Sequence, residues 1–174
     1  MNGTIDNQQV TQTEAAWLAG IWDGEGSFGT CYANKNTSKN FGIRISVVNS
    51  DATILKKITD ILDKADIGYH VQEKGYGAFP GSHKQVWAIR IGKYKQGAMA
   101  LDLMMPYLSG KLSRAQLLKK FINSRLSRIQ KVSRNSDCPY SKEELELLAN
   151  ICDLNGNQRG TSETIRAEIA NRGL

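Results

Sequence analysis

The stretch Leu18-Ala-Gly-Ile-Trp-Asp-Gly-Glu-Gly-Ser-Phe28 decides the fold, because it predicts the end of one helix and the start of a strand. The helix begins upstream, where Thr11 and Glu14 have the spacing of a capping box. An apolar run continues it, and Gly24 and Gly26 predict its end. Two acidic residues, one on each side of the first of these glycines, are therefore expected at the helix C-terminus.

Strand and helix patterns alternate in the residues that follow. Residues 27–32 and 41–47 predict a first hairpin, whose tip is the polar run 34–40. Ser50 is expected to cap a second helix, because apolar residues then recur at helical spacing over residues 54–62. This part of the chain therefore has the order helix, strand, strand, helix.

The pattern then continues with a second hairpin and a third helix. Residues 67–74 and 85–91 predict the two strands, and the loop between them, residues 75–82, contains glycine and proline. A helix is expected at about residues 94–107. These elements complete the order αββαββα.

Three further helices are expected in the C-terminal part of the chain. The first runs over about residues 113–131 and is expected to expose Arg125 and Arg128. A capping box that starts at Ser141 predicts the second helix, and the third spans residues 162–170. The helices therefore follow the two hairpins rather than alternate with more strands.

The predicted fold class is α+β, an αββαββα core with a four-stranded antiparallel sheet and additional C-terminal helices. We interpret the chain as one domain with an N-terminal tail (residues 1–10), a core (11–136) and a helical extension (137–174).

Helices would cover one face of the predicted sheet. Polar side chains on the other face could read base edges in a DNA major groove, and an ordinary solvated face is the alternative. The residues predicted for DNA contact are Lys35, Asn40, Arg44, Ser46, Gln72, Lys74 and Gln85.

Charge is unevenly distributed along the 174 residues. Residues 137–174 contain four basic and seven acidic side chains, a net charge of −3, whereas the first 136 residues contain nineteen and ten, a net charge of +9. A basic body indicates a polyanionic partner such as nucleic acid.

Three scattered cysteines argue for reduced thiols inside a cell, and against a disulfide framework or a zinc site. The sequence shows neither a membrane-spanning run nor a signal peptide.

The acidic pair at the predicted helix end, Asp23 and Glu25, suggests metal chemistry. Ala19, Gly20 and Gly24 are small enough for two copies of this helix to pair closely about a twofold axis. The carboxylates of both copies would then repel each other and the DNA phosphates unless divalent cations lay between them. The alternative is a simple C-cap, in which a glycine adopts a left-handed conformation and Asp23 makes a local hydrogen bond.

The motif Leu-Ala-Gly-x-x-Asp-Gly-Glu-Gly at residues 18–26 resembles the signature of the LAGLIDADG homing endonucleases. The predicted element order and the segments Val47-Val-Asn49, Pro106-Tyr-Leu108 and Thr161-Ser-Glu-Thr-Ile-Arg-Ala167 also resemble single-motif, homodimeric members. The resemblance covers nearly the whole chain, from about Thr11 onward. It implies a homodimer, because one motif supplies one carboxylate and half of a DNA-binding saddle.

The resemblance implies roles for individual residues of the site. Glu25 is expected to bind the metal at the scissile phosphate, with the Gly24 carbonyl as a second ligand, and Asp23 is expected to be mainly structural. Asn49 would orient the water network, and Lys111 would stabilise charge near the cleaved bond. An ordinary surface lysine is the alternative for Lys111. The residues predicted for the dimer interface are Leu18, Ala19, Gly20 and Asp23.

The chain departs from some relatives in the first turn of the second predicted helix. Where those relatives have an arginine, this sequence has Thr53. Lys56 or Lys57 could compensate from the next turn, and a solvated helix face is the alternative for both. The basic part of the predicted site therefore rests on weaker sequence evidence than Glu25.

The activity implied by the resemblance is site-specific cleavage of double-stranded DNA, as in intron-encoded homing endonucleases. It would be Mg²⁺-dependent phosphodiester hydrolysis at a long, partly palindromic site. Mn²⁺ or Ca²⁺ could also occupy the site, and Ca²⁺ is not expected to support cleavage. The expected partners are duplex DNA and a second copy, with no membrane and no small-molecule substrate. The expected location is intracellular, in a chloroplast, a mitochondrion or a prokaryotic cytoplasm.

Two other function classes compete with a nuclease. A non-cleaving nucleic-acid binder, such as an intron maturase, could keep the same fold, but the motif carboxylate is present here as Glu25. A small-molecule-binding α+β domain is disfavoured by the polar strand faces and the basic body. The carboxylate therefore favours the enzyme without excluding an additional role in splicing.

Overall fold

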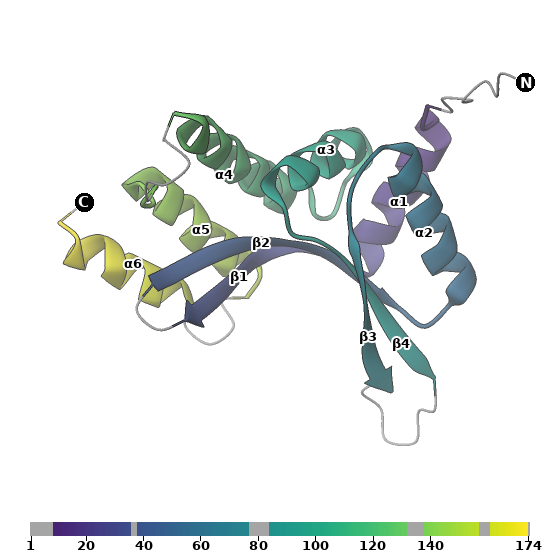
Figure 1. Cartoon of the computed structure of the whole chain (residues 1–174), viewed down its shortest axis with the longest axis horizontal. Coiled ribbons are helices and arrows are strands. Elements are labelled where there is room, and N and C mark those ends of the chain that lie inside the picture. The colour runs from purple at the N-terminus through teal and green to yellow at the C-terminus, as the bar shows by residue number, and fades with distance from the viewer. Residues whose placement is uncertain (1–8, 36–37, 77–83, 132–137, 157–160, 174) are drawn as a thin grey trace, which may run out of the picture.

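The computed structural model describes residues 9–35, 38–76, 84–131, 138–156 and 161–173. It has the α+β fold that the sequence predicts, an αββαββα core followed by further helices (Figure 1). None of the helices in the described residues is long and apolar enough to cross a membrane. The elements are α1 (Gln12–Gly24), β1 (Gly26–Lys35), β2 (Ser38–Asn49), α2 (Ala52–Lys64), β3 (His70–Tyr76), β4 (Gln85–Ile91), α3 (Tyr94–Met104), the 3₁₀ turn η1 (Met105–Tyr107), α4 (Leu112–Gln130), α5 (Lys142–Leu154) and α6 (Thr161–Asn171).

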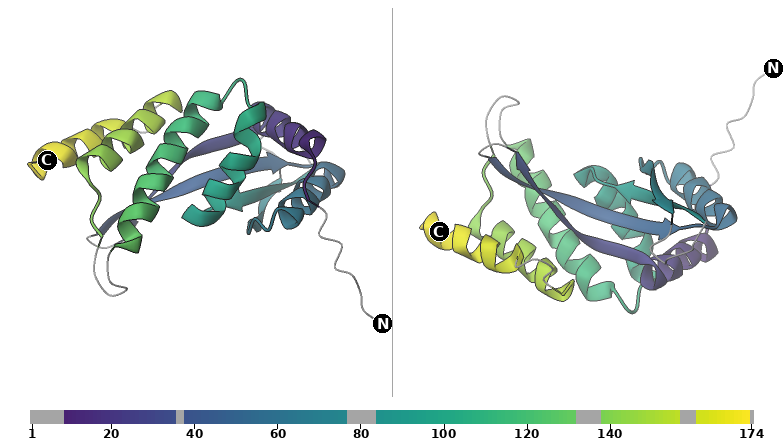
Figure 2. Two further views of the ribbon diagram at one scale, coloured as in Figure 1. Left: turned by 90° about the horizontal axis from the view of Figure 1, so that it is seen from above. Right: turned by 90° about the horizontal axis from the view of Figure 1, so that it is seen from below.

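The four strands form one antiparallel sheet in the order β1-β2-β4-β3. Figure 1 shows α3 and α4 above the β1–β2 half, whereas the β3–β4 hairpin turns downward because the sheet is strongly twisted. Seen from below, β1 and β2 lie in front of these helices (Figure 2). We call this uncovered side of the sheet the open face. The predicted arrangement of helices on one side of the sheet is thus confirmed.

The core lies between the sheet and the helices. Ile43, Ile45 and Val47 of β2 and Ile89 of β4 are at most 3% exposed and belong to one apolar cluster. Strand residues between them in sequence therefore point to the open face. Gly97 lets α3 approach the sheet closely, because a Cβ there would lie 2.4 Å from Cδ1 of Ile43.

Two local predictions are wrong at the ends of β2. The strands of the first hairpin extend to Lys35 and Ser38, so most of the expected tip, residues 34–40, pairs as strand. Asp51, rather than Ser50, caps α2, because its carboxylate accepts hydrogen bonds at 2.7 and 3.2 Å from two main-chain N–H groups of the first turn. Both residue types suit an N-cap, and the helix begins one residue later than the sequence indicated.

The capping box at Ser141 is confirmed, but the expected exposure of Arg125 is wrong. Arg125 is 6% exposed, and its guanidinium lies 3.2 Å from the carboxylate of the fully buried Glu144 and 3.1 Å from the carbonyl of Cys138. Arg128, 34% exposed at its side chain, also donates to Glu144. Helix α5 covers a face of α4 that periodicity alone assigned to solvent. Removing either partner of a buried ion pair typically costs about 3–5 kcal/mol.

Candidate active site

The C-terminal end of α1 carries the acidic residues of the motif. Glu25 is the C-cap residue, has right-handed backbone angles (φ −110°, ψ −14°), and donates its N–H to the carbonyls of Ile21 and Trp22. Neither Gly24 nor Gly26 has a positive φ, so the alternative of a left-handed glycine cap is wrong. Gly26 is instead required for space, because a Cβ there would lie 2.5 Å from Cδ1 of Trp22.

Asn49, the last residue of β2, contacts the Glu25 carboxylate. Its Nδ2 donates a hydrogen bond to Glu25 Oε2, and its Oδ1 accepts one from the main-chain N–H of Asp51 at 2.7 Å. The second bond fixes the orientation of the amide, so that its donor side faces the carboxylate. Glu25 itself is exposed. Two residues that the sequence placed in the catalytic set therefore meet at the junction of α1 and β2.

Asp23 joins α1 to the start of α4. Its carboxylate accepts hydrogen bonds from the main-chain N–H groups of Ser109 (2.7 Å), Gly110 (3.2 Å) and Lys111 (2.8 Å), and from the Ser109 hydroxyl (3.2 Å). Burial alone would raise the pKa of Asp23, but these donors together outweigh burial and hold the pKa below its usual value. The side chain is therefore an anionic anchor in this chain.

Lys111 completes this contact from the opposite direction. Its ammonium Nζ donates to the carbonyls of Gly26 (2.7 Å), Trp22 (2.9 Å) and, at a longer 3.4 Å, Gly24. Burial lowers the pKa of Lys111, as does the nearby charge of Arg114, while Asp23 acts in the opposite sense. A cation thus lies against the negative end of the α1 dipole.

The oxygen atoms at the end of α1 suit a hard divalent cation. The Glu25 carboxylate and the Gly24 carbonyl are adjacent in sequence, and the carbonyls around them already bind a cation, the Lys111 ammonium. In the described residues no three His, Cys, Asp or Glu side chains converge to hold a metal. Mg²⁺ is usually bound by one or two carboxylates together with water and substrate phosphate, so this donor set fits Mg²⁺ in the presence of DNA.

One known protein family matches this chain in sequence. The profile of the LAGLIDADG-like domain matches residues 12–97, from the start of α1 into α3. The chain belongs to the LAGLIDADG homing endonuclease family. No curated protein sequence matches it.

Solved LAGLIDADG structures share the fold. The homing endonuclease I-CvuI, in complex with its target in the presence of 2 mM Ca, matches with a TM-score of 0.66 and 16% identity, over 93% of this chain and 96% of that chain. I-CvuI with the I-CreI target and 2 mM Mg matches with a TM-score of 0.61 and 16% identity, over 94% and 96% of the two chains. The group I intron-encoded I-CeuI, complexed with DNA, gives 0.55 and 17%, over 83% and 65%. At these identities the likeness shows the fold.

In this LAGLIDADG chain the first turn of α2 has Thr53 and no arginine. The two lysines considered as substitutes are both engaged in other contacts. Lys56 Nζ lies 2.7 Å from the Asp60 carboxylate, and Lys57 Nζ lies 4.2 Å from the centre of the Trp17 ring. The structure therefore brings neither lysine to Glu25.

Two other basic residues lie near the site, and the sequence reasoning missed both. Main-chain hydrogen bonds lower the pKa of Asp51 most, and the charge of Lys84, just before β4, lowers it further. Arg114, in the first turn of α4, lies close enough to Lys111 to lower the pKa of that lysine. The spacing of three residues between Lys111 and Arg114 was a usable signal. No sequence signal indicated that Lys84 lies near Asp51, because its position depends on the pairing of β4 with β2.

The open face carries several of the residues predicted to contact DNA. Arg44 is exposed, and Gln72 lies on the same face by register and is also exposed. Ser46 points to this face but is only 8% exposed. It pairs with Arg90, which in turn pairs with His70 across the sheet. Arg90 and His70 were missed, although their strand positions could have revealed them.

The other four residues of that prediction have different outcomes. Lys35 and Asn40 occupy open-face positions of the register, and their side chains lie outside the described part of the structure. Lys74 falls within a β-bulge, where alternation no longer fixes the facing. Gln85 lies two residues before Trp87 in β4, so both point to the helix-covered side of the sheet. Its Nε2 is buried without a hydrogen-bond partner in the described residues. The predicted place of Gln85 on the open face is therefore wrong.

The predicted dimer interface needs a similar correction. Leu18 and Ala19 are fully buried in the core of this chain, so they cannot touch a second copy. Gly20 and Gly24 are exposed, and a Cβ on either would meet nothing within 4 Å. Small residues serve equally well inside a core and between chains, which is why the motif alone did not separate the two uses.

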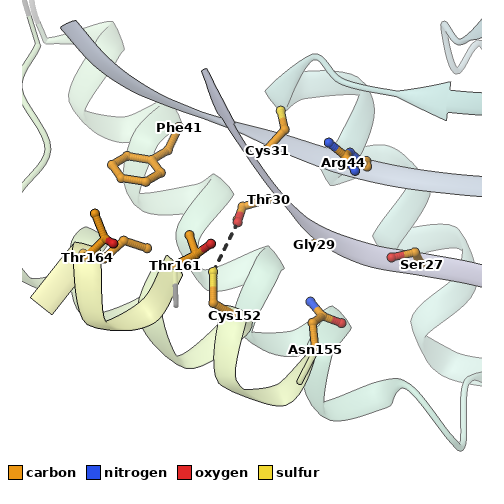
Figure 3. A pocket seen from close by; sticks show the side chains of 11 residues that line it. Ser27, Gly29, Thr30, Cys31, Phe41, Arg44, Cys152, Asn155, Thr161 and Thr164 are labelled. Atoms are coloured by element: carbon orange, nitrogen blue, oxygen red, sulfur yellow. Dashed lines mark hydrogen bonds between the residues drawn. The ribbon is translucent and has the colours of Figure 1, made fainter. Parts of the chain in front are cut away.

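A cavity of about 570 Å³ lies between β1 and the α5–α6 pair. Figure 3 shows Ser27 and Arg44 on the strands and Asn155 on the helical side of the hollow. Thr30 Oγ1 and Cys152 Sγ are 3.7 Å apart, and Asn155 Nδ2 donates to the carbonyl of Phe28 at 3.0 Å. The C-terminal helices are thus attached directly to the edge strand.

Proposed function

We propose that this chain is a homodimeric, site-specific DNA endonuclease that hydrolyses phosphodiester bonds with Mg²⁺. The observation that carries the proposal is the position of Glu25, an exposed carboxylate at the tip of α1, oriented by Asn49 and adjacent to the Gly24 carbonyl. Membership of the family supports the class of activity. The I-CvuI complexes with DNA, one with Ca and one with Mg, support DNA and a divalent cation as ligands.

The residues around α1 would share the chemistry. Glu25 and the Gly24 carbonyl would hold Mg²⁺, which when bound activates water and stabilises the leaving oxygen. Asn49 keeps the carboxylate oriented before substrate arrives, because its own amide is held by Asp51. Lys111 would provide positive charge beside the cleaved bond. Ca²⁺ accepts more ligands in a looser geometry than Mg²⁺, so we expect it to bind without supporting cleavage.

DNA would lie along the open face of the sheet. Arg44, Gln72, Arg90 and His70 lie on this face by register, and the whole chain has a net charge of +6. A twisted antiparallel ribbon fits the major groove, where side chains can distinguish base pairs. Side chains there would contact bases and phosphates, while the α1 tip would approach the backbone. The site would be partly palindromic and about 20 bp long.

Two copies would be needed to cut both strands, because this sequence contains one motif and one Glu25 tip. A second α1 would pack against Gly20 and Gly24, where the surface has room for a close helix contact. The carboxylates of the two copies would then lie side by side, with the cations between them. A cyclic twofold dimer of this kind imposes the partial palindrome on the site.

Cleavage by purified protein tests the proposal. With Mg²⁺ the chain is expected to cut a duplex that contains its site, and the joined sequences that flank its reading frame are the first candidate. Glu25→Gln removes a charged metal ligand without changing the size of the side chain, so it should bind this duplex like the unmodified chain but not cut it. Equal cleavage by the variant would refute the assignment. Tight binding of DNA without cleavage by the unmodified chain would favour a non-cleaving binder.

A further inference from the structure

The C-terminal end of α1 depends on a cation from another segment. The last turn of the helix contains no basic residue, although two acidic residues lie at its end. Lys111, just before α4, supplies the positive charge by donating to the carbonyls of Trp22, Gly24 and Gly26. These carbonyls therefore form a cation-binding cluster, and in this structure the cation is an ammonium.

The same cluster overlaps the place proposed for the metal. Lys111 Nζ lies 3.4 Å from the Gly24 carbonyl, the longest of its three contacts, and Glu25 is the next residue. A divalent ion bound to that carbonyl at about 2.0–2.6 Å would lie within a few ångströms of the ammonium. Two cations so close, with one carbonyl between them, repel each other.

The lysine is built so that its charge can move while its backbone stays in place. The main-chain N–H of Lys111 donates to Asp23 at 2.8 Å, together with those of Ser109 and Gly110. The side chain beyond this anchor is a flexible four-carbon stem with three donors, and it can reach another acceptor without disturbing α4. A DNA phosphate at the α1 tip would be such an acceptor.

We propose that, without DNA, the Lys111 ammonium occupies the cation position beside the Gly24 carbonyl, and that a DNA phosphate draws it away. This inference rests on the proposed function, because it concerns the same metal site. It makes metal binding and DNA binding cooperative: each ligand removes an obstacle to the other. The chain then assembles a competent centre chiefly on its substrate.

Metal titration without DNA tests this competition. Tb³⁺ is a suitable probe, because indole side chains sensitise its luminescence and Trp22 contributes one of the three carbonyls. Lys111→Gln is expected to bind Tb³⁺ about tenfold more tightly than the unmodified chain, since one neighbouring positive charge is removed. Lys111→Arg keeps the charge and should bind as weakly as the unmodified chain. Lys120→Gln, an exposed lysine of α4, is the matched control and should change nothing.

The possible outcomes separate this inference from the proposed function. Glu25→Gln should abolish the Tb³⁺ signal, which shows that the signal reports this site. If the unmodified chain gives no metal signal even with duplex DNA, the proposed function fails. If that signal is present but Lys111→Gln binds Tb³⁺ no more tightly than the unmodified chain, only the competition is refuted.

A second measurement needs no variant and so does not depend on how well one folds. Acylation of lysine amines, read by mass spectrometry, reports whether an ammonium is engaged. Saturating Ca²⁺ without DNA should raise the acylation rate of Lys111 severalfold, because the metal displaces it from the carbonyls, while Lys120 stays unchanged. An unchanged or reduced rate at Lys111 would overturn the inference.

Discussion

Gly24 and Gly26 stand two residues apart in the motif, yet they face different physical demands. A Cβ at Gly26 would lie 2.5–2.7 Å from two ring atoms and the Cα of Trp22, whereas one at Gly24 would meet nothing within 4 Å. The ring and main chain of Trp22 cannot move far, because the side chain is fully buried in the core. Gly26 therefore serves packing within the chain, and Gly24 leaves room outside it.

Alanine at each position separates these roles. Gly26→Ala is expected to lower the free energy of unfolding by about 1–3 kcal/mol, as overpacking of a core does. Gly24→Ala should change the stability of the single chain by no more than about 0.5 kcal/mol, because the new methyl group meets no other atom of that chain. Urea unfolding followed by tryptophan fluorescence measures both. Equal losses for the two variants would show that the close contact with Trp22 does not decide the requirement for glycine.

Single residues also show what a sequence can and cannot predict at this site. The motif placed Glu25 at a helix end, and the strand pattern placed Asn49 where the two side chains meet. The carbonyl contacts of Lys111 had no sequence signature, because every residue has a carbonyl and these lie 85 to 89 positions away. Side-chain identity therefore predicts contacts between two side chains better than it predicts contacts between a side chain and main-chain groups.

Between elements, the first turn of α1 is tied to the last turn of α2. Lys64 Nζ lies 2.6 Å from Glu14, whose carboxylate also accepts from the main chain of Thr11 in the capping box. The hydrogen bond from Lys64 and then that from Thr11 lower the pKa of Glu14 from 4.5 to about 2. One carboxylate therefore stabilises a helix start and a helix–helix contact.

This pKa predicts an acid-dependent loss of stability. Because the folded pKa of Glu14 lies below its unfolded value, its contribution is complete above about pH 4.5 and is lost as the pH falls toward about 2. Glu14→Gln should therefore show a flatter fall in the free energy of unfolding over this range. Glu143→Gln, an exposed acidic residue in the first turn of α5, is the control. Parallel curves for Glu14→Gln and the unmodified chain would contradict the prediction.

Element boundaries were predictable where the chemistry is local. The capping boxes at Thr11 and Ser141 fix two helix starts, because both partners lie within four residues. The sequence predicts Ser50 as a cap, but the adjacent Asp51 is an equally good cap, and the main-chain path decides between the two. The burial of Arg125 could not be read from its own helix, because the neutralising Glu144 belongs to α5.

For the whole molecule, the proposed homodimer requires a surface through which two copies can pair. Gly20 and Gly24 leave an exposed strip on α1 that the rest of the described chain does not fill. The open face of the sheet is long in one copy, but each copy has only one Glu25 tip. Pairing through the strip would set two such faces end to end.

A large side chain on this strip tests the pairing. A Cβ at Gly20 would meet nothing within 4 Å in this chain, and Gly20→Leu improves helix propensity by up to about 1 kcal/mol, so the single copy should be at least as stable. Light scattering should nevertheless give the mass of one chain, and double-strand cleavage should be lost. Gln116→Leu, an exposed site on α4, should leave both unchanged. A Gly20→Leu variant that still dimerises would place the interface elsewhere.

The opposed anchoring of Asp23 and Lys111 has a consequence for how such a protein diversifies. Four hydrogen bonds from the start of α4 hold Asp23, and the Lys111 ammonium holds the carbonyls at the tip in return. Under the proposed function, each chain would carry its half of the reaction centre on a main chain that its own helices fasten. Under the same proposal, mutations in the strands of the open face could accumulate without loosening that main-chain anchor, so new target sequences would become accessible while the chemistry was inherited unchanged.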